Sequence, residues 1–212
     1  MNSIDRQTKK TIQENGATLI RVNIRYPEFS GGSTDALERA NRCIRQMTEA
    51  VANTAVAALY EEARAARMML GDAFPGFEIT TRYVVTYQQD GLFSLFFDIF
   101  LGAGGLSGST YRYGWTWLLK ETRPMFITAL FPEHAPIRDI VTGFVSSIHQ
   151  HPEWTDAINT YYSSENFYLT DRGLAVFYQP RTIAPGAAGV RAFVLPYGKS
   201  GLIQPERIGQ NR

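Results

Sequence analysis

The residues that could do chemistry fall into a few groups, and each group departs from a complete motif. The glycine-rich run GAGGLSG at 102–108 has Ser107 where a dinucleotide fingerprint places its third glycine, and no helical pattern follows it. A nucleophile elbow in the same run would need glycine in place of Ser109. The Gly-Lys-Ser sequence at 198–200 resembles the end of a phosphate-binding loop, but Phe193 stands where that motif requires glycine. The sequence therefore favours neither a nucleotide cofactor nor a catalytic serine.

The histidines and the cysteine do not form a recognisable site either. His149 and His151 are two positions apart at a predicted helix end and point in different directions, and His134 lies at the other end of that helix. An interaction of His149 and His151 with the dipole at the carboxyl end of the helix is the simpler interpretation. Cys43 falls inside a helical pattern, where a thiol usually behaves as a small apolar side chain. We therefore expect no metal, no cofactor and no catalytic residue that can be named from local spacing.

Composition excludes several classes of partner. The 212 residues are 44% hydrophobic and 19% charged, and 21 basic against 20 acidic residues leave a net charge of +1. Such a balance provides no general field for nucleic acid or an anionic membrane. The sequence has no secretory signal pattern and no apolar run of about 18 residues that would span a bilayer, so cytoplasmic localisation is the default expectation.

Periodicity predicts an α+β fold with an antiparallel sheet, one long helix in the first half and a second helix in the other half. The first 17 residues read as a polar tail. Alternating residues predict a strand that Pro27 ends, and helical spacing then predicts a helix from Thr34 to Met69. Three further runs read as an antiparallel meander with a turn at Asp90-Gly91; they are 78–88, 92–101 and 110–120.

The second half is predicted to contain a helix beginning near Pro136, a short helical piece after Trp154, a hairpin over 166–178, a last strand at 190–197 and a tail over 198–212. Four aromatic residues share one face of the strand at 110–120: Tyr111, Tyr113, Trp115 and Trp117. Packing beneath the long helix is a better expectation for them than a stacking platform for sugars or bases. The elements form either one compact unit or two halves that share a sheet.

The stretch NFYLTDRGLAVFYQPRTIAPGAAGVRAFVLPY resembles the carboxyl-terminal signature of the DUF3298 family. Upstream, RYPEFSGG with ALERANRCIRQ is similar to the DUF4163 domain, including Tyr26, Pro27 and Asn41. The resemblance implies a DUF4163-like part at 18–101 and a DUF3298-like part at 102–197. Where members of the family commonly show Gly-Gly-Ala-His, this chain has Gly104-Gly105-Leu106-Ser107, and the usual Thr-Gly-Lys turn is Thr122-Arg123-Pro124.

The resemblance also implies binding, because the family is known from a lysozyme-sensing anti-sigma factor and from a module attached to a peptidoglycan deacetylase. The loop after the hairpin is stiffened by its prolines and can pass close to the sheet through its glycines. We therefore predict a noncatalytic module that recognises a protein or a cell-wall glycan. The candidate contact residues are Tyr178, Arg181, Ile183 and Pro185 in this loop and Gly104, Gly105 and Ser107 in the glycine run. A regulatory protein that self-associates through a sheet edge and a cell-wall hydrolase with an unrecognised site are the alternatives.

Overall fold

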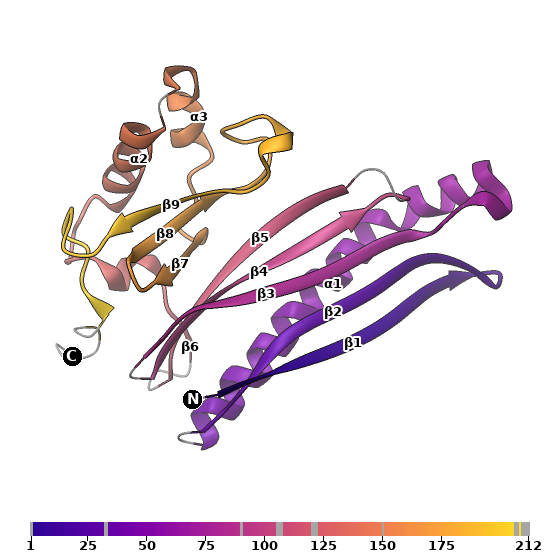
Figure 1. Cartoon of the computed structure of the whole chain (residues 1–212), viewed down its shortest axis with the longest axis horizontal. Helices are drawn as coiled ribbons and strands as arrows, with labels where there is room; N and C mark the ends of the chain where they lie inside the picture. Colours follow the sequence, from indigo (N-terminus) through magenta and orange to yellow (C-terminus); the bar gives the residue numbers. More distant parts are fainter. Residues whose placement is uncertain are drawn as a thin grey trace. The chain divides into compact units, whose positions relative to one another are not determined.

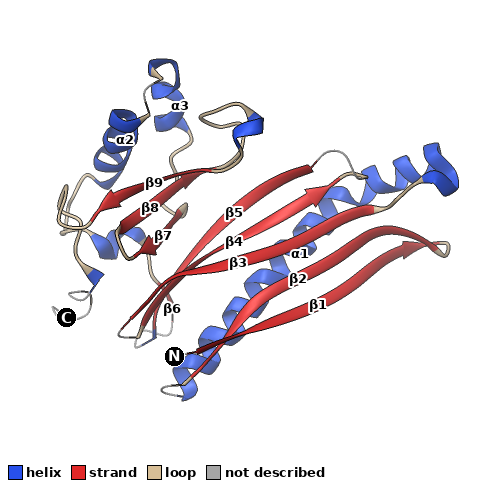
Figure 2. Ribbon diagram, viewed as in Figure 1, coloured by secondary structure: helices blue, strands red, loops and turns tan. Residues whose placement is uncertain are grey.

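The chain combines two β-sheets with three α-helices in the computed structural model, which describes residues 2–31, 34–89, 91–104, 108–119, 123–149, 151–205 and 208. The first sheet has the order β1 (Asn2–Glu14), β2 (Ala17–Ser30), β3 (Phe77–Gln89), β4 (Leu92–Gly102), β5 (Gly108–Leu118) and β6 (Arg123–Pro124). The second has the order β7 (Phe167–Thr170), β8 (Gly173–Tyr178) and β9 (Arg191–Pro196). The helices are α1 (Thr34–Leu70), α2 (Ile137–Ile148) and α3 (Thr155–Thr160) (Figures 1 and 2). The α+β class predicted from the sequence is confirmed.

The elements divide into two compact units that are not consecutive segments of the chain. Unit 1 comprises 1–83 and 97–111, and unit 2 comprises 84–96 and 112–212. The strands β3, β4 and β5 therefore each contribute residues to both units. The family boundary that the resemblance implies, between 101 and 102, does not coincide with these limits and stays a prediction.

In unit 1, the long helix connects two parallel strands. The helix predicted from Thr34 to Met69 is confirmed, with its end one residue later. Its buried side chains recur at helical spacing: Leu37, Ala40, Ile44, Thr48, Ala52, Ala55 and Ala63. β2 and β3 pair in parallel from Ile20 opposite Phe77 to Asn23 opposite Thr80. Such a pair needs a long crossover connection, which α1 supplies, so the sheet is not antiparallel throughout.

The amino-terminal segment is a strand, which corrects the prediction of a polar tail. β1 pairs antiparallel with β2 along its whole length. The turn between them is Asn15-Gly16, with φ of 50° and 78°, and this dipeptide is the usual signal for a tight hairpin turn. The sequence interpretation missed it because the preceding residues do not alternate in polarity.

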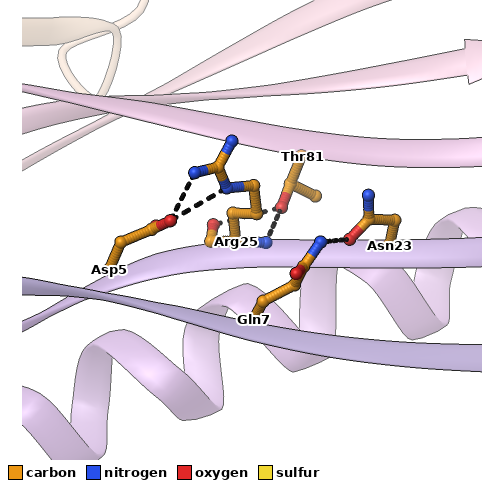
Figure 3. Close-up of polar contacts among 5 residues, drawn as sticks. All are labelled: Asp5, Gln7, Asn23, Arg25 and Thr81. Carbon is orange, nitrogen blue, oxygen red and sulfur yellow. Dashed lines mark hydrogen bonds and ion pairs between the residues drawn. The ribbon is translucent and has the colours of Figure 1, made fainter.

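Polar cross-strand contacts take the place of apolar ones in this hairpin. Figure 3 shows Arg25 of β2 paired with Asp5 of β1, and Gln7 donating to the Asn23 side-chain oxygen at 2.7 Å. The Thr81 hydroxyl bonds both the amide and the carbonyl of Arg25, which extends the connection to β3. Arg6 and Glu28 form a further pair at 2.8 Å. These contacts explain how a strand with almost no buried side chain keeps its register.

Pro27 does not end β2, which corrects a second prediction. The strand continues to Ser30, and Pro27 lies opposite Asp5. The β2–β3 register stops at Asn23, so near Pro27 the strand has its ladder partner on one side only, where a missing amide hydrogen can be tolerated. The Asn41 side chain on α1 then accepts from the amide of Phe29 and donates to its carbonyl, both at 2.8 Å.

In unit 2, the antiparallel sheet β7–β8–β9 packs against a core to which α2 and α3 contribute buried side chains. The predicted helix, short helix, hairpin and last strand of this half are confirmed. The segment after β9 was predicted to be a tail, but Leu202 is buried and the Ile203 amide donates to the Leu130 carbonyl at 2.9 Å.

The aromatic face of β5 agrees with the sequence interpretation only in part. Trp115 and Trp117 are buried, whereas Tyr111 and Tyr113 remain exposed. On the opposite face of the strand, a side chain at Gly114 would meet the Phe167 carbonyl oxygen at 1.8 Å. The strands of unit 2 therefore approach each other through backbone at this point.

Candidate functional site

The predicted contact segment begins at Tyr178, the last residue of β8, and continues into the loop that follows. Tyr178 is 1% exposed and its hydroxyl donates to the Ile158 carbonyl at 3.2 Å. Burial, and next the neighbouring Tyr162, raise the pKa of Tyr178 to about 12. Ile183 is also fully buried. Both residues were predicted as contacts for a partner, but here their side chains anchor the loop.

The side chain of Gln179 attaches the start of the loop to β5. Its oxygen accepts from the Arg112 amide at 3.0 Å, and its nitrogen donates to the Arg112 carbonyl at 2.7 Å. Arg112 is itself fixed, because its guanidinium lies 3.6 Å from the centre of the Phe96 ring. A single side chain thus satisfies the donor and the acceptor of one backbone residue.

A histidine supports the middle of the loop. His149 follows α2, and its Nε2 lies 3.1 Å from the Ile183 carbonyl. A carbonyl oxygen only accepts, so Nε2–H is the donor. His151 instead lies 3.2 Å from Glu153. The structure thus gives His149 a contact with the loop that its position in the sequence did not indicate.

The exposed part of the loop consists of Arg181, Pro185, Gly186, Ala187 and Ala188, called here the loop surface. Arg181 has φ of 65°, a left-handed conformation that is uncommon for a residue with a side chain. Its side chain lies along Gly186, where an added Cβ would be 2.8 Å from Arg181 Nε. Among the described residues, none forms an ion pair with Arg181. The loop surface therefore presents a guanidinium and a proline from a fixed backbone.

The glycine run belongs to unit 1, whereas the loop after β8 belongs to unit 2. Gly104 has φ of 79°, which glycine adopts without strain. Gly105 and Ser107 lie outside the described residues.

Two pockets, one in each unit, were not predicted. The pocket of unit 1 has a volume of about 300 Å³ and is lined by Thr80, Thr81, Arg82, Asp98, Phe100 and Thr110. The pocket of unit 2 has a volume of about 270 Å³ and is lined by Tyr87, Gln89, Asp171, Tyr197 and Gln204. The residues that line each pocket come from segments far apart in the sequence. From the sequence alone, only the alternation of residues along one strand, as of Asp98 and Phe100, could have indicated that two of them share a face.

No cluster of three histidine, cysteine or acidic side chains able to hold a metal ion occurs within the described part of the chain. Burial raises the pKa of the Cys43 thiol. Within the same described part, no helix is both long and apolar enough to cross a bilayer.

These observations define the class as an α+β protein with a buried hairpin and a rigid proline-containing loop in its second unit. Residues 130–198 match the family described as "Protein of unknown function (DUF3298)", so the chain carries a DUF3298 region, as the sequence resemblance implied. The DUF4163-like character of the first part stays a prediction. No curated protein matches the sequence.

Two solved structures of DUF3298 family members have a similar fold. The structure from Bacteroides fragilis is 15% identical, with a TM-score of 0.64, over 98% of this chain and 95% of that chain. The structure from Pseudomonas aeruginosa is 16% identical, with a TM-score of 0.59, over 97% of this chain and 96% of that chain. At this level of identity the similarity establishes the fold.

Proposed function

We propose that the protein is a noncatalytic binding module that recognises a protein or a cell-wall glycan through the loop surface. The observation that carries the proposal is that contacts on both sides of the exposed Arg181 hold its backbone in place. Gln179 bonds the Arg112 backbone before Arg181, and Ile183 is buried and accepts from His149 after it. A loop that is already ordered loses little conformational entropy when a partner binds.

The chemistry of the loop surface suits a polar partner. A guanidinium donates several hydrogen bonds in one plane and is frequent at the centre of protein interfaces. Pro185 is exposed beside it and offers a rigid apolar contact. The left-handed backbone of Arg181 is the kind of local strain that often accompanies a functional position.

Self-association through a sheet edge receives less support. β1 is the outermost strand of its sheet, and it carries Arg6, Lys9 and Lys10. Exposed charges, lysines above all, are a common means of preventing edge strands from pairing with one another.

Replacing Arg181 with glutamate tests the proposal. The immobilised chain is exposed to extract from its native source, and separately mixed with purified insoluble cell wall, and the bound protein or the sedimented chain is measured. We expect the variant to lose at least about tenfold in retention, because reversing a charge at an interface removes a favourable contact and adds repulsion.

Arg172→Glu is the matched control, since Arg172 is also exposed and lies in unit 2, at the β7–β8 turn. It makes the same change in charge and should leave retention unaltered. Equal losses in both variants would indicate a general charge effect, and no loss in either would contradict the assignment of the loop surface.

A further inference from the structure

The pocket of unit 1 lies on the face of the sheet that points away from the buried core of that unit. On β3, Thr80 and Arg82 alternate with the buried Ile79 and Thr81, and on β4 the exposed Phe100 follows the buried Ile99. Successive side chains of a strand point to opposite faces. The pocket is therefore open to solvent and formed on regular strands, which hold side chains more rigidly than loops do.

The floor of the pocket is an aromatic ring that lies across glycine backbone. A Cβ added at Gly102 would be 2.8 Å from the Phe100 ring, and one added at Gly108 would be 2.3 Å from it. The two glycines thus leave room for the ring to lie against β4 and β5. Phe100 nevertheless remains 38% exposed, so part of the ring is available to a ligand.

The rim of the pocket is polar and carries no net charge. Arg82 Nη2 lies 3.4 Å from Asp98 Oδ2; the arginine side chain is 74% exposed and the aspartate side chain 2% exposed. The exposed guanidinium offers several donors, and the buried Asp98 carboxylate holds it in place. The Thr80 hydroxyl donates to Glu78 Oε1 at 3.1 Å and keeps its acceptor role, while the Thr110 hydroxyl is able to donate and accept. The lining residues thus contribute one charge of each sign, which provides no excess charge to select an anion or a cation.

We propose that this pocket binds one ring of a neutral sugar. The C–H face of a pyranose carries slight positive charge and packs on the negative face of an aromatic ring. Each of its hydroxyls can donate and accept, so it can accept from the Arg82 guanidinium and donate to the Thr80 and Thr110 hydroxyl oxygens. A volume of about 300 Å³ lies at the lower end of the range for ligand pockets, which fits a single ring and its near surroundings. The proposal concerns unit 1 and does not depend on the loop surface of unit 2.

A purely structural role for Phe100 accounts for only part of this arrangement. An aromatic ring placed over glycines protects the backbone of a sheet, which explains the contact with Gly102 and Gly108. It does not require an exposed guanidinium and two hydroxyls beside the exposed ring. A ligand with an apolar face and a hydroxylated edge uses both.

The test is a titration of the ¹⁵N-labelled full chain with cellotriose, maltotriose and chitotriose, followed by amide chemical shifts. We expect at least one trisaccharide to shift the amide resonances of Phe100, Gly102 and Thr110 in a saturable way. Phe100→Ala should weaken that binding at least about tenfold. The side chain introduced by Phe100→Leu still covers Gly102 and Gly108 but has no aromatic face. This variant therefore separates loss of stacking from loss of folding.

Tyr111→Ala is the matched control, because Tyr111 is also 38% exposed in unit 1 but neighbours Thr110 on β5 and so points to the other face. It should bind as the wild type does. If no trisaccharide shifts the pocket resonances, or if Phe100→Leu binds as tightly as the wild type, the proposal is wrong. Shifts confined to Arg181 and its neighbours would also overturn it, while supporting the loop surface as the glycan site.

Discussion

At the scale of single residues, two side-chain amides make hydrogen bonds to strand backbone that a neighbouring strand usually makes. Asn41 bonds both polar groups of Phe29 in unit 1, and Gln179 bonds both polar groups of Arg112 in unit 2. Each amide satisfies both the donor and the acceptor of one strand residue, and a buried polar group left unsatisfied would cost about 1–3 kcal/mol. Asn41 belongs to the pattern that prompted the DUF4163 resemblance, and its contact with Phe29 gives that position a physical reason.

Tyr178 should make the stability of the chain depend on alkaline pH. The pKa of its phenol is about 12 in the folded chain, whereas the ordinary value, which we take for the unfolded chain, is 10. Below pH 10 the phenol is neutral in both states, and between pH 10 and 12 only the unfolded chain loses the proton. The stabilisation is therefore fully present below pH 10 and is lost as the pH rises toward 12, by about 3 kcal/mol in total.

Urea unfolding at intervals from pH 8 to pH 12 measures this effect. Tyr178→Phe should unfold about 1 kcal/mol more easily at pH 8, since it lacks the bond to Ile158, but its stability should fall less steeply above pH 10. Tyr161→Phe, at a half-exposed position, is the control and should follow the wild type. An alkaline slope unchanged in Tyr178→Phe would show that other groups cause it.

At the scale of elements, strands in unit 2 meet through backbone at positions that only glycine can occupy. Gly114 of β5 faces the Phe167 carbonyl of β7, and a Cβ added at Gly173 of β8 would lie 2.0 Å from the Leu195 carbonyl oxygen of β9. Next to the first of these contacts, the Ser94 hydroxyl bonds the Thr116 hydroxyl at 2.7 Å and accepts from the Leu169 amide at 2.9 Å. These small residues let β7 approach β4 and β5 closely.

Alanine at Gly114 should therefore be severely destabilising. The new methyl group would overlap the Phe167 carbonyl, and backbone cannot move aside as a flexible side chain can, so we expect a loss of about 3 kcal/mol or more. Gly143→Ala is the opposite case, because Gly143 lies inside α2 with nothing within 4 Å of the added atom. That variant should gain about 0.5–1 kcal/mol. The urea midpoints of both variants measure these changes in stability. An unchanged midpoint in Gly114→Ala would contradict the close approach of β5 and β7.

The same elements show what a sequence can and cannot predict. α1 and α2 were predicted correctly because their apolar residues recur within one segment. β1 was missed because its partners are charged and amide side chains on β2, although Asn15-Gly16 marked its turn. The pocket at Phe100 and the bond between Gln179 and Arg112 depend on which strands become neighbours, and local periodicity carries no such information.

At the scale of the whole molecule, the segment that matches the family is smaller than the unit that contains it. The match covers 130–198, whereas unit 2 also includes 84–96 and 112–129. Those additional residues supply buried side chains to the core of the unit, among them Tyr87, Leu92 and Leu118. They also supply Ser94 and Arg112, whose contacts fix β7 and the loop after β8.

An isolated fragment of residues 130–198 should therefore not fold. Its three-stranded sheet would expose the apolar side chains that β3, β4 and β5 cover in the full chain, and a small domain has little stability to spare. We expect amide proton shifts crowded into the random-coil range and no cooperative urea transition. A fragment of residues 84–212 restores every residue of unit 2 and should regain dispersed shifts for β7, β8 and β9. Cooperative unfolding of the shorter fragment would show that the family segment is a domain in its own right, and that β3 to β5 add to its stability without being required for its fold.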